Sequence, residues 1–253
     1  MTATATPGMT AAPTPFHRLL AVEARKLVDT RSGKALVLVL AGLVPAAVAA
    51  RGAVSGPELQ ALVNAAGIGP GTLLPVLGIL TVTGEWSHRT ALTTFTLEPR
   101  RGRVLAAKFL PALAAAVAAC VLAVLAAVPA TAVTAAVQGV PAVWEVDPAA
   151  LLGWAGVQVL MVAEGLGMGV LLLNAPAAIV ICLASPMVWA VVGRLGSAGA
   201  TLAEWFDLNT TTGPLMSGDL SGGGAARLAV SVLVWIAVPM AAGAVRVIRG
   251  EVR

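Results

Sequence analysis

Glu164 is the acidic side chain that lies deepest inside an apolar stretch of this sequence, which makes it the first candidate for chemistry. It sits within residues 149–173, a run with no other charged side chain. An ionisable group inside a membrane segment is costly and is a functional candidate by default. Together with Gln158, Glu164 could line a substrate path or carry a proton. The alternative is a hydrogen-bonded residue that packs helices together.

The other reactive side chains form no catalytic or metal-binding pattern. His17 and His88 have no second His, Cys or paired acid at the spacing of metal ligands. Cys120 and Cys182 each lie in an apolar run, where a free cysteine behaves as a small apolar filler. A phosphate-binding loop is also missing, because the only Gly-Lys pair, at Gly33, lacks the Ser or Thr that should follow it. We therefore expect no enzyme, metal or cofactor site on this chain.

The elements that would position Glu164 and Gln158 are predicted to be membrane-spanning helices. The 253 residues are 58% hydrophobic and only 11% charged, whereas a soluble domain carries about 25% charged residues. The mean hydropathy is +0.91. We expect an all-α, polytopic membrane protein with six spans. These spans are residues 35–50, a helix starting near residue 71 within 59–84, and residues 105–128, 149–173, 176–193 and 228–245.

Most basic residues fall on one predicted side of the membrane. The other side keeps Arg51, Arg194 and Arg227 and most of the loop acids. Because cytoplasmic loops are enriched in Lys and Arg, we expect a multi-pass plasma-membrane protein with both termini in the cytoplasm. The predicted cytoplasmic set is Arg18, Arg25, Lys26, Arg31, Lys34, Arg89, Arg100, Arg101, Arg103, Lys108, Arg246, Arg249 and Arg253.

The N-terminal region divides into a predicted disordered tail, residues 1–15, and an interface segment, residues 16–34. Over residues 16–30, apolar side chains recur at helical spacing on one face, and Glu23 falls within that apolar stripe. One interpretation is a helix on the membrane surface with Glu23 at the water line. The other is a docking helix whose Glu23 meets a basic group of a partner. Residues 35–253 would form the six-span domain.

The loop at residues 85–108 is the longest charged stretch between spans on the predicted cytoplasmic side. Residues 90–97 are long enough for about two helical turns, and Pro99 ends them because it disfavours helix in the preceding residue. Composition alone suits a basic loop bound to anionic lipid. Residues 194–226 form the external segment, where residues 202–208 suit an amphipathic helix and Gly222–Gly224 would provide slack. Gly165 and Gly169 have the spacing typical of close helix packing.

Two short motifs resemble those of ABC-2-type permeases, the membrane subunits of one class of ATP-driven exporter. In that family an acid ends the second helix, and a Thr, a short helix, Pro, Arg and a Lys opening the third helix follow. Glu85, Thr90, Pro99, Arg103 and Lys108 match this order. The segment "VEARKLVDTRSGK" similarly resembles the family's sequence before its first helix, although Ala24 stands where the family often has Trp.

The resemblance implies a coupling helix within residues 85–97 that docks on a separate ATPase subunit, which would carry the ATP and Mg. It also implies a second permease chain, as homodimer or heterodimer, and an exporter of unidentified cargo. The alternatives are a non-transporting membrane anchor or immunity protein and an intramembrane enzyme built around Glu164. The residues that the resemblance places at or beside the ATPase are Glu23, Glu85, His88, Arg89, Thr90, Thr94, Arg100, Arg101 and Arg103.

Overall fold

The fold is known from a computed structural model that describes residues 14–250. The disordered tail predicted for residues 1–15 therefore lies almost wholly outside the described residues. Within them the secondary structure is helical apart from one isolated bridge between Glu58 and Val143, which confirms the all-α prediction. The helices are α1 Phe16–Asp29, α2 Arg31–Ser55, α3 Leu59–Ala66, α4 Ile68–Ser87, α5 Ala91–Leu97, α6 Arg101–Gln138, α7 Pro148–Leu172, α8 Ala175–Val192, α9 Gly196–Phe206, α10 Leu208–Met216, α11 Gly222–Val232, a π-helical turn Leu233–Ala237 and α12 Val238–Arg249.

Six of these segments are long and apolar enough to cross a membrane. They are α2, α3 with α4, α6, α7, α8, and α11 through α12. Many large apolar side chains on them are exposed, such as Leu38, Leu152 and Met187, each more than 70% exposed. A soluble monomer rarely exposes apolar surface on this scale. The chain is therefore a polytopic membrane protein whose outer face meets lipid.

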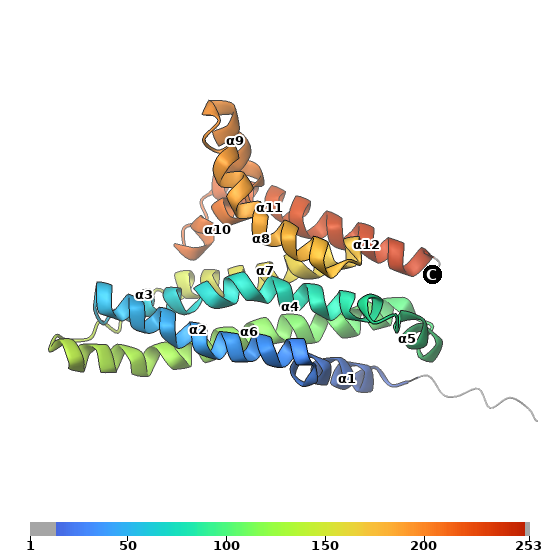
Figure 1. The fold of residues 1–253 in the computed structure, drawn as a ribbon. Coiled ribbons are helices and arrows are strands. Elements are labelled where there is room, and N and C mark those ends of the chain that lie inside the picture. Colours follow the sequence, from blue (N-terminus) through green and yellow to red (C-terminus); the bar gives the residue numbers. More distant parts are fainter. Residues whose placement is uncertain (1–13, 251–253) are drawn as a thin grey trace, which may run out of the picture.

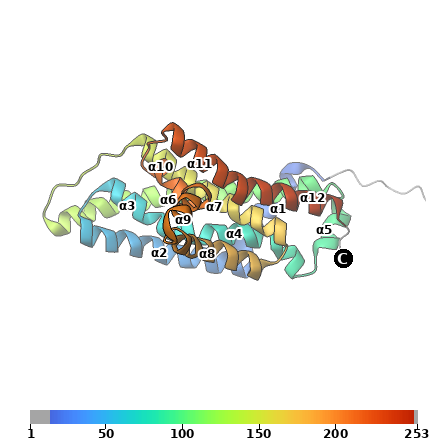
Figure 2. The ribbon, with the colours of Figure 1, turned by 90° about the horizontal axis from the view of Figure 1, so that it is seen from above.

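The long helices run side by side, and the charged segments gather where they end (Figure 1). Helix α1, helix α5, the start of α6 and the end of α12 lie together, and we call this the basic end. The view from above shows the same grouping (Figure 2). Helix α3, the end of α6 and the start of α7 form the opposite end. There, the loop before α7 is tied to α3 by hydrogen bonds from Leu59 N to Val143 O and from Val143 N to Pro57 O.

Helices α4 and α7 form the buried centre of the bundle. Glycines let their backbones approach closely: a Cβ at Gly165 would overlap the carbonyl oxygen of Pro75, and one at Gly78 would lie 2.7 Å from Val162 O. Around this contact, Leu74, Val82, Val162, Leu166 and Val170 are almost completely buried. Any side chain on the facing sides of α4 and α7 is therefore held in a fixed place.

Several helices extend beyond the spans predicted from hydropathy. Helix α2 begins at Arg31 rather than residue 35, and α4 begins at Ile68 rather than near residue 71. Helix α6 has 38 residues, which is about 57 Å at 1.5 Å per residue, nearly twice the roughly 30 Å of a bilayer core. Apolarity marks the lipid-facing part of a helix, but hydrogen bonding continues the helix into water at either end.

The segment after α8 folds back over the bundle as the short helices α9 and α10. Helices α9 and α10 rise from one side of it (Figure 1), and α10 packs on α7. Trp235 Nε1 donates a hydrogen bond of 2.7 Å to Phe206 O, and the hydroxyls of Thr211 and Ser231 lie 2.6 Å apart. The prediction that Gly222–Gly224 forms a slack linker is wrong, because these glycines begin α11.

Candidate functional site

A cluster of two buried acids, one buried lysine and one exposed lysine joins three helices at the basic end. Glu23 belongs to α1, Glu85 to the last turn of α4 and Lys108 to α6. Lys108 is only 1% exposed, and its Nζ lies 3.0 Å from Glu23 Oε2 and 3.0 Å from Glu85 Oε1. Lys26 completes the set, with Nζ 2.6 Å from Glu23 Oε1 and 3.2 Å from Glu85 Oε1. We call these four residues the Lys–Glu cluster.

The Lys–Glu cluster is stabilised because its positive and negative charges are equal in number. Burial alone would lower the pKa of Lys26, but the carboxylates of Glu23 and Glu85 outweigh it and hold that pKa above its ordinary value. Lys26 is therefore protonated at neutral pH. Two ammonium groups then face two carboxylates, which avoids the high cost of an unpaired buried charge. The cluster fixes α1 against the bundle and joins the end of α4 to the start of α6.

Helix α5 is anchored beside this cluster by its inward face. Ala91 and Phe95 are buried, and the Phe95 ring meets Trp86 edge-on at 6.1 Å between centroids. The Arg101 guanidinium lies 5.0 Å from the centre of the same ring and donates to the carbonyls of Val247 and Gly250 near the end of α12. A helix this short is not stable alone, so these contacts hold it in place.

The turns on either side of α5 are also fixed. Arg89 adopts a positive φ of 56° in the turn after α4, and Thr90 N donates to Glu85 O at 2.8 Å. After α5, the buried Glu98 accepts a hydrogen bond of 3.1 Å from Arg103. Arg103 also donates to Thr14 O. Both ends of α5 are thus held by the segments that continue into α4 and α6.

The residues predicted to contact an ATPase separate into an inward and an outward group. Glu23 and Glu85 point inward into the Lys–Glu cluster, and Arg101 and Arg103 are half-buried in contacts within the chain. The outward group is His88, Arg89, Thr90 and Arg100, with Thr94 half-buried beside them. The exposed part of α5 adds side chains that the sequence analysis did not single out: Leu92, Thr93, Thr96 and Leu97.

The inward position of Glu23 and Glu85 changes the part they can play. Each carboxylate has an ammonium partner within the chain, so both hold helices together, and their place at or beside an ATPase stays a prediction. Lys26 and Lys108 were missing from the predicted set. For Lys108 the sequence held an indication, because this lysine lies inside an apolar helix where a lone charge requires a partner.

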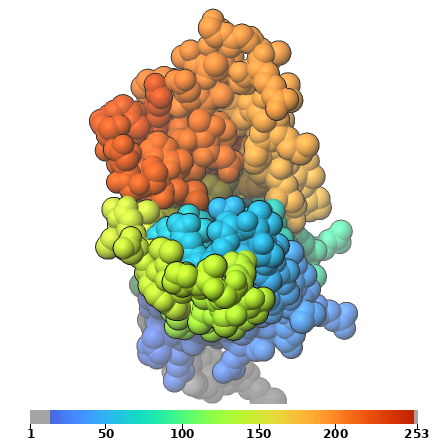
Figure 3. Space-filling view, turned by 90° about the vertical axis from the view of Figure 1, so that its left-hand side faces the viewer, coloured from blue at the N-terminus to red at the C-terminus, as the bar shows by residue number. Residues whose placement is uncertain are grey.

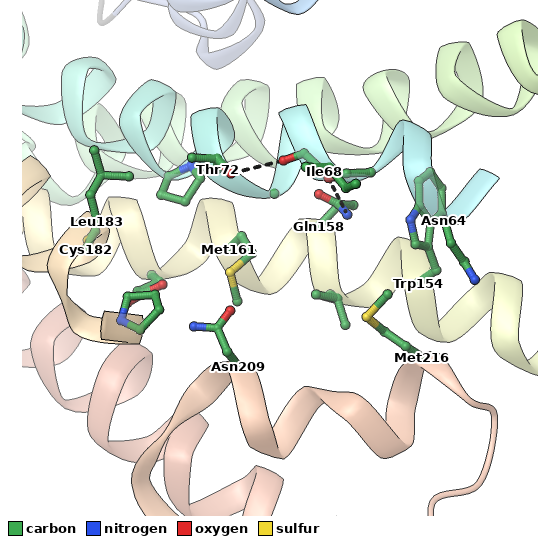
Figure 4. A pocket seen from close by; sticks show the side chains of 16 residues that line it. Asn64, Ile68, Thr72, Trp154, Gln158, Met161, Cys182, Leu183, Asn209 and Met216 are labelled. Carbon is green, nitrogen blue, oxygen red and sulfur yellow. Dashed lines mark hydrogen bonds between the residues drawn. The ribbon is translucent and has the colours of Figure 1, made fainter. Parts of the chain in front are cut away.

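Glu164 and Gln158 lie away from the basic end, on the wall of a cavity of about 340 Å³. Figure 4 shows Met161 of α7 facing Asn209 of α10, while Gln158 points from α7 towards α4, which carries Thr72. Figure 3, which looks onto the opposite end, shows the surface hollowed between α8–α10 and α2–α3. Gln158 Nε2 lies 3.5 Å from Gly67 O. The structure therefore brings the two predicted path residues to one cavity.

Gly165 and Gly169 lie on the side of α7 that meets α4. A Cβ at Gly165 would overlap the Pro75 carbonyl, and one at Gly169 would come within 3.1 Å of Ile79 Cα. Helix α7 therefore uses one face to pack on α4, while Glu164, directly before Gly165, reaches the cavity.

Among residues 14–250, no group of three or more His, Cys, Asp or Glu side chains is placed to hold a metal ion. No model of a known protein family matches the chain, and no curated protein matches it. The Lys–Glu cluster with α5, and the cavity at Glu164, are therefore interpreted from their own geometry.

Proposed function

We propose that this chain is the membrane-spanning permease subunit of an ABC-2-type exporter, driven by ATP hydrolysis on a separate subunit. The observation that carries the proposal is that the Lys–Glu cluster joins α4 and α6, the two spans on either side of α5. In the motif that resembles the permease family, an acid ends the second span and a lysine opens the third. Here these two residues, Glu85 and Lys108, form a buried ion pair of 3.0 Å.

In this proposal α5 is the lever on which the ATPase acts. Its outward face combines apolar Leu92 and Leu97, 55% and 77% exposed, with threonines and with Arg89 and Arg100 nearby. An apolar centre with a polar rim is typical of a protein interface. Two ATPase subunits, each binding ATP and Mg, would dock beneath a pair of permease chains in the cytoplasm.

Rigidity is what lets such a lever transmit motion. When the ATPases close on ATP, a displacement of α5 passes to α4 and α6, because both flanking turns are hydrogen-bonded and the Lys–Glu cluster joins the two spans. Helix α4 packs along α7, which carries Glu164 and Gln158. Movement of α4 relative to α7 would then open the cavity at these residues, the proposed cargo path.

Affinity purification of the tagged chain from its native membranes in mild detergent tests the proposal. The test variant is Leu92→Asp with Leu97→Asp, which places charge on the outward face of α5. Its matched control is Leu220→Asp, an exposed leucine between α10 and α11 at 44% exposure. We expect an ATPase with a phosphate-binding loop to co-purify with the wild type and the control, and its recovery to fall at least tenfold with the α5 variant.

Two results would contradict the proposal: no ATPase with the wild-type chain, or equal recovery with all three forms. Recovery of a toxin-like peptide in place of an ATPase would support the membrane-anchor or immunity alternative instead.

A further inference from the structure

The cavity beside Glu164 has the features of a ligand site. It lies between α3–α4, α7, α8 and α10 and has a volume of about 340 Å³, within the range of small-molecule pockets. A second cavity of about 390 Å³ at the opposite end shares Asn64 and Ile68 with it. The polar side chains that line the first cavity are Asn64, Thr72, Trp154, Gln158, Glu164 and Asn209.

Two buried polar atoms on this wall have no hydrogen-bond partner. Gln158 is 3% exposed and Trp154 is 1% exposed, yet Gln158 Oε1 and Trp154 Nε1 are both unpaired within residues 14–250. Buried polar groups in folded proteins are nearly always satisfied by protein, water or a ligand. These two atoms leave unmet hydrogen-bonding capacity in the polar wall of the cavity, where α7 meets α3 and α4.

Glu164 differs from every other buried acid of the described chain. Glu23 and Glu85 pair with lysines, Glu98 pairs with Arg103, and the Asp207 carboxylate accepts from Asn209 N and Thr210 Oγ1. Glu164, 5% exposed, has neither an ion pair nor a hydrogen bond in residues 14–250. Asp207 lies within electrostatic reach of it, which adds negative potential. An ionised carboxylate in this place requires a cation from outside the chain.

We propose that this cavity binds a small organic amine in its protonated form. The ammonium group pairs with the Glu164 carboxylate, the one buried acid of residues 14–250 that has no partner within them. The remainder of the wall is apolar, formed largely by Val157, Met161, Pro186 and Met216, and accommodates a hydrocarbon body. The identification of this amine as the cargo rests on the proposed function, whereas its binding requires only this chain.

Binding of benzylamine to the purified chain in lipid nanodiscs tests the proposal without any ATPase. Radiolabelled benzylamine is displaced with unlabelled compound, so that partition into lipid is subtracted, and benzyl alcohol serves as the neutral analogue. We expect saturable benzylamine binding at least ten times tighter than that of benzyl alcohol. Glu164→Gln should weaken it at least tenfold.

The control is Glu145→Gln, an exposed acid in the loop before α7, which should leave binding unchanged. Leu183→Trp fills the cavity from α8 without removing a polar group and should abolish binding, so the test does not depend on the folding of Glu164→Gln. Benzylamine should also raise the Tm of the wild type but not that of Glu164→Gln. Three results would each overturn the proposal. They are the absence of displaceable benzylamine binding, an affinity for benzyl alcohol equal to that for benzylamine, and an unchanged affinity for benzylamine in Glu164→Gln. Amine binding by a chain that recruits no ATPase would retain the site and remove only its role as cargo path.

Discussion

Lys108 is a buried charge whose two counter-charges come from other helices. Its position in the sequence, inside an apolar helix, indicates that it needs a counter-charge. The two acids that provide one are 85 and 23 residues away along the chain, and no local pattern connects them. The sequence therefore singles out Glu23 and Glu85 as candidate residues, but their lysine partners become evident only in three dimensions.

The two lysines of the Lys–Glu cluster should contribute very differently to stability. Lys108→Met leaves two buried carboxylates facing one remaining lysine, and breaking a buried pair costs about 3–5 kcal/mol. Lys26, whose side chain is 45% exposed, is screened by water, and Lys26→Met should cost less than about 1 kcal/mol. The measurement is the free energy of unfolding in mixed micelles at neutral pH, below the raised pKa of Lys26, where both lysines are charged.

A double-mutant cycle separates pairing from simple loss of packing. If Lys108 acts through Glu23, then Glu23→Gln should cost clearly less in a Lys108→Met background than in the wild type. Additive costs, or equal effects of Lys108→Met and Lys26→Met, would contradict the paired arrangement described here.

At the scale of helices, apolar runs were a reliable guide to which segments exist and a poor guide to where they end. Six spans, the N-terminal helix and the short helix at Ala91–Leu97 were all predicted from pattern. The length of α6 was not predicted, because hydropathy does not distinguish the ends of this helix from a loop. The glycines of α11 were misjudged because glycine weakens helices in water, whereas membrane helices tolerate it.

The contact between α4 and α7 gives a prediction at this scale. Gly165→Ala places a methyl group against the Pro75 carbonyl, and overpacking of this kind typically costs about 1–3 kcal/mol. The matched control is Gly84→Ala in α4, where nothing lies within 4 Å of the added carbon, so its stability should stay level or rise. Thermal unfolding of both variants in the same detergent measures the difference. A Gly165→Ala protein as stable as Gly84→Ala would show that the two helices do not meet in this way.

At the scale of the whole molecule, the basic residues and the cavity lie in different parts of the fold. Segments far apart in sequence, namely α1, α5 and the end of α12, lie together at the basic end (Figure 1). The cavity beside Glu164 lies away from them, towards the side carrying α10. The proposed function requires the basic end to face the cytoplasm, which is also the side that the distribution of Lys and Arg predicts. The site of energy input and the cavity would then be joined by α4.

Side-specific labelling of single cysteines tests this arrangement most directly. In a chain with Cys120→Ala and Cys182→Ala, one cysteine is introduced at Thr96→Cys on α5 or at Leu220→Cys before α11, both exposed positions. A membrane-impermeant maleimide is added to sealed, right-side-out vesicles. We expect Leu220→Cys to react at once and Thr96→Cys to react only after the vesicles are permeabilised. Labelling of Thr96→Cys in sealed vesicles would place α5 outside the cell, beyond the reach of any cytoplasmic ATPase, and would contradict the account.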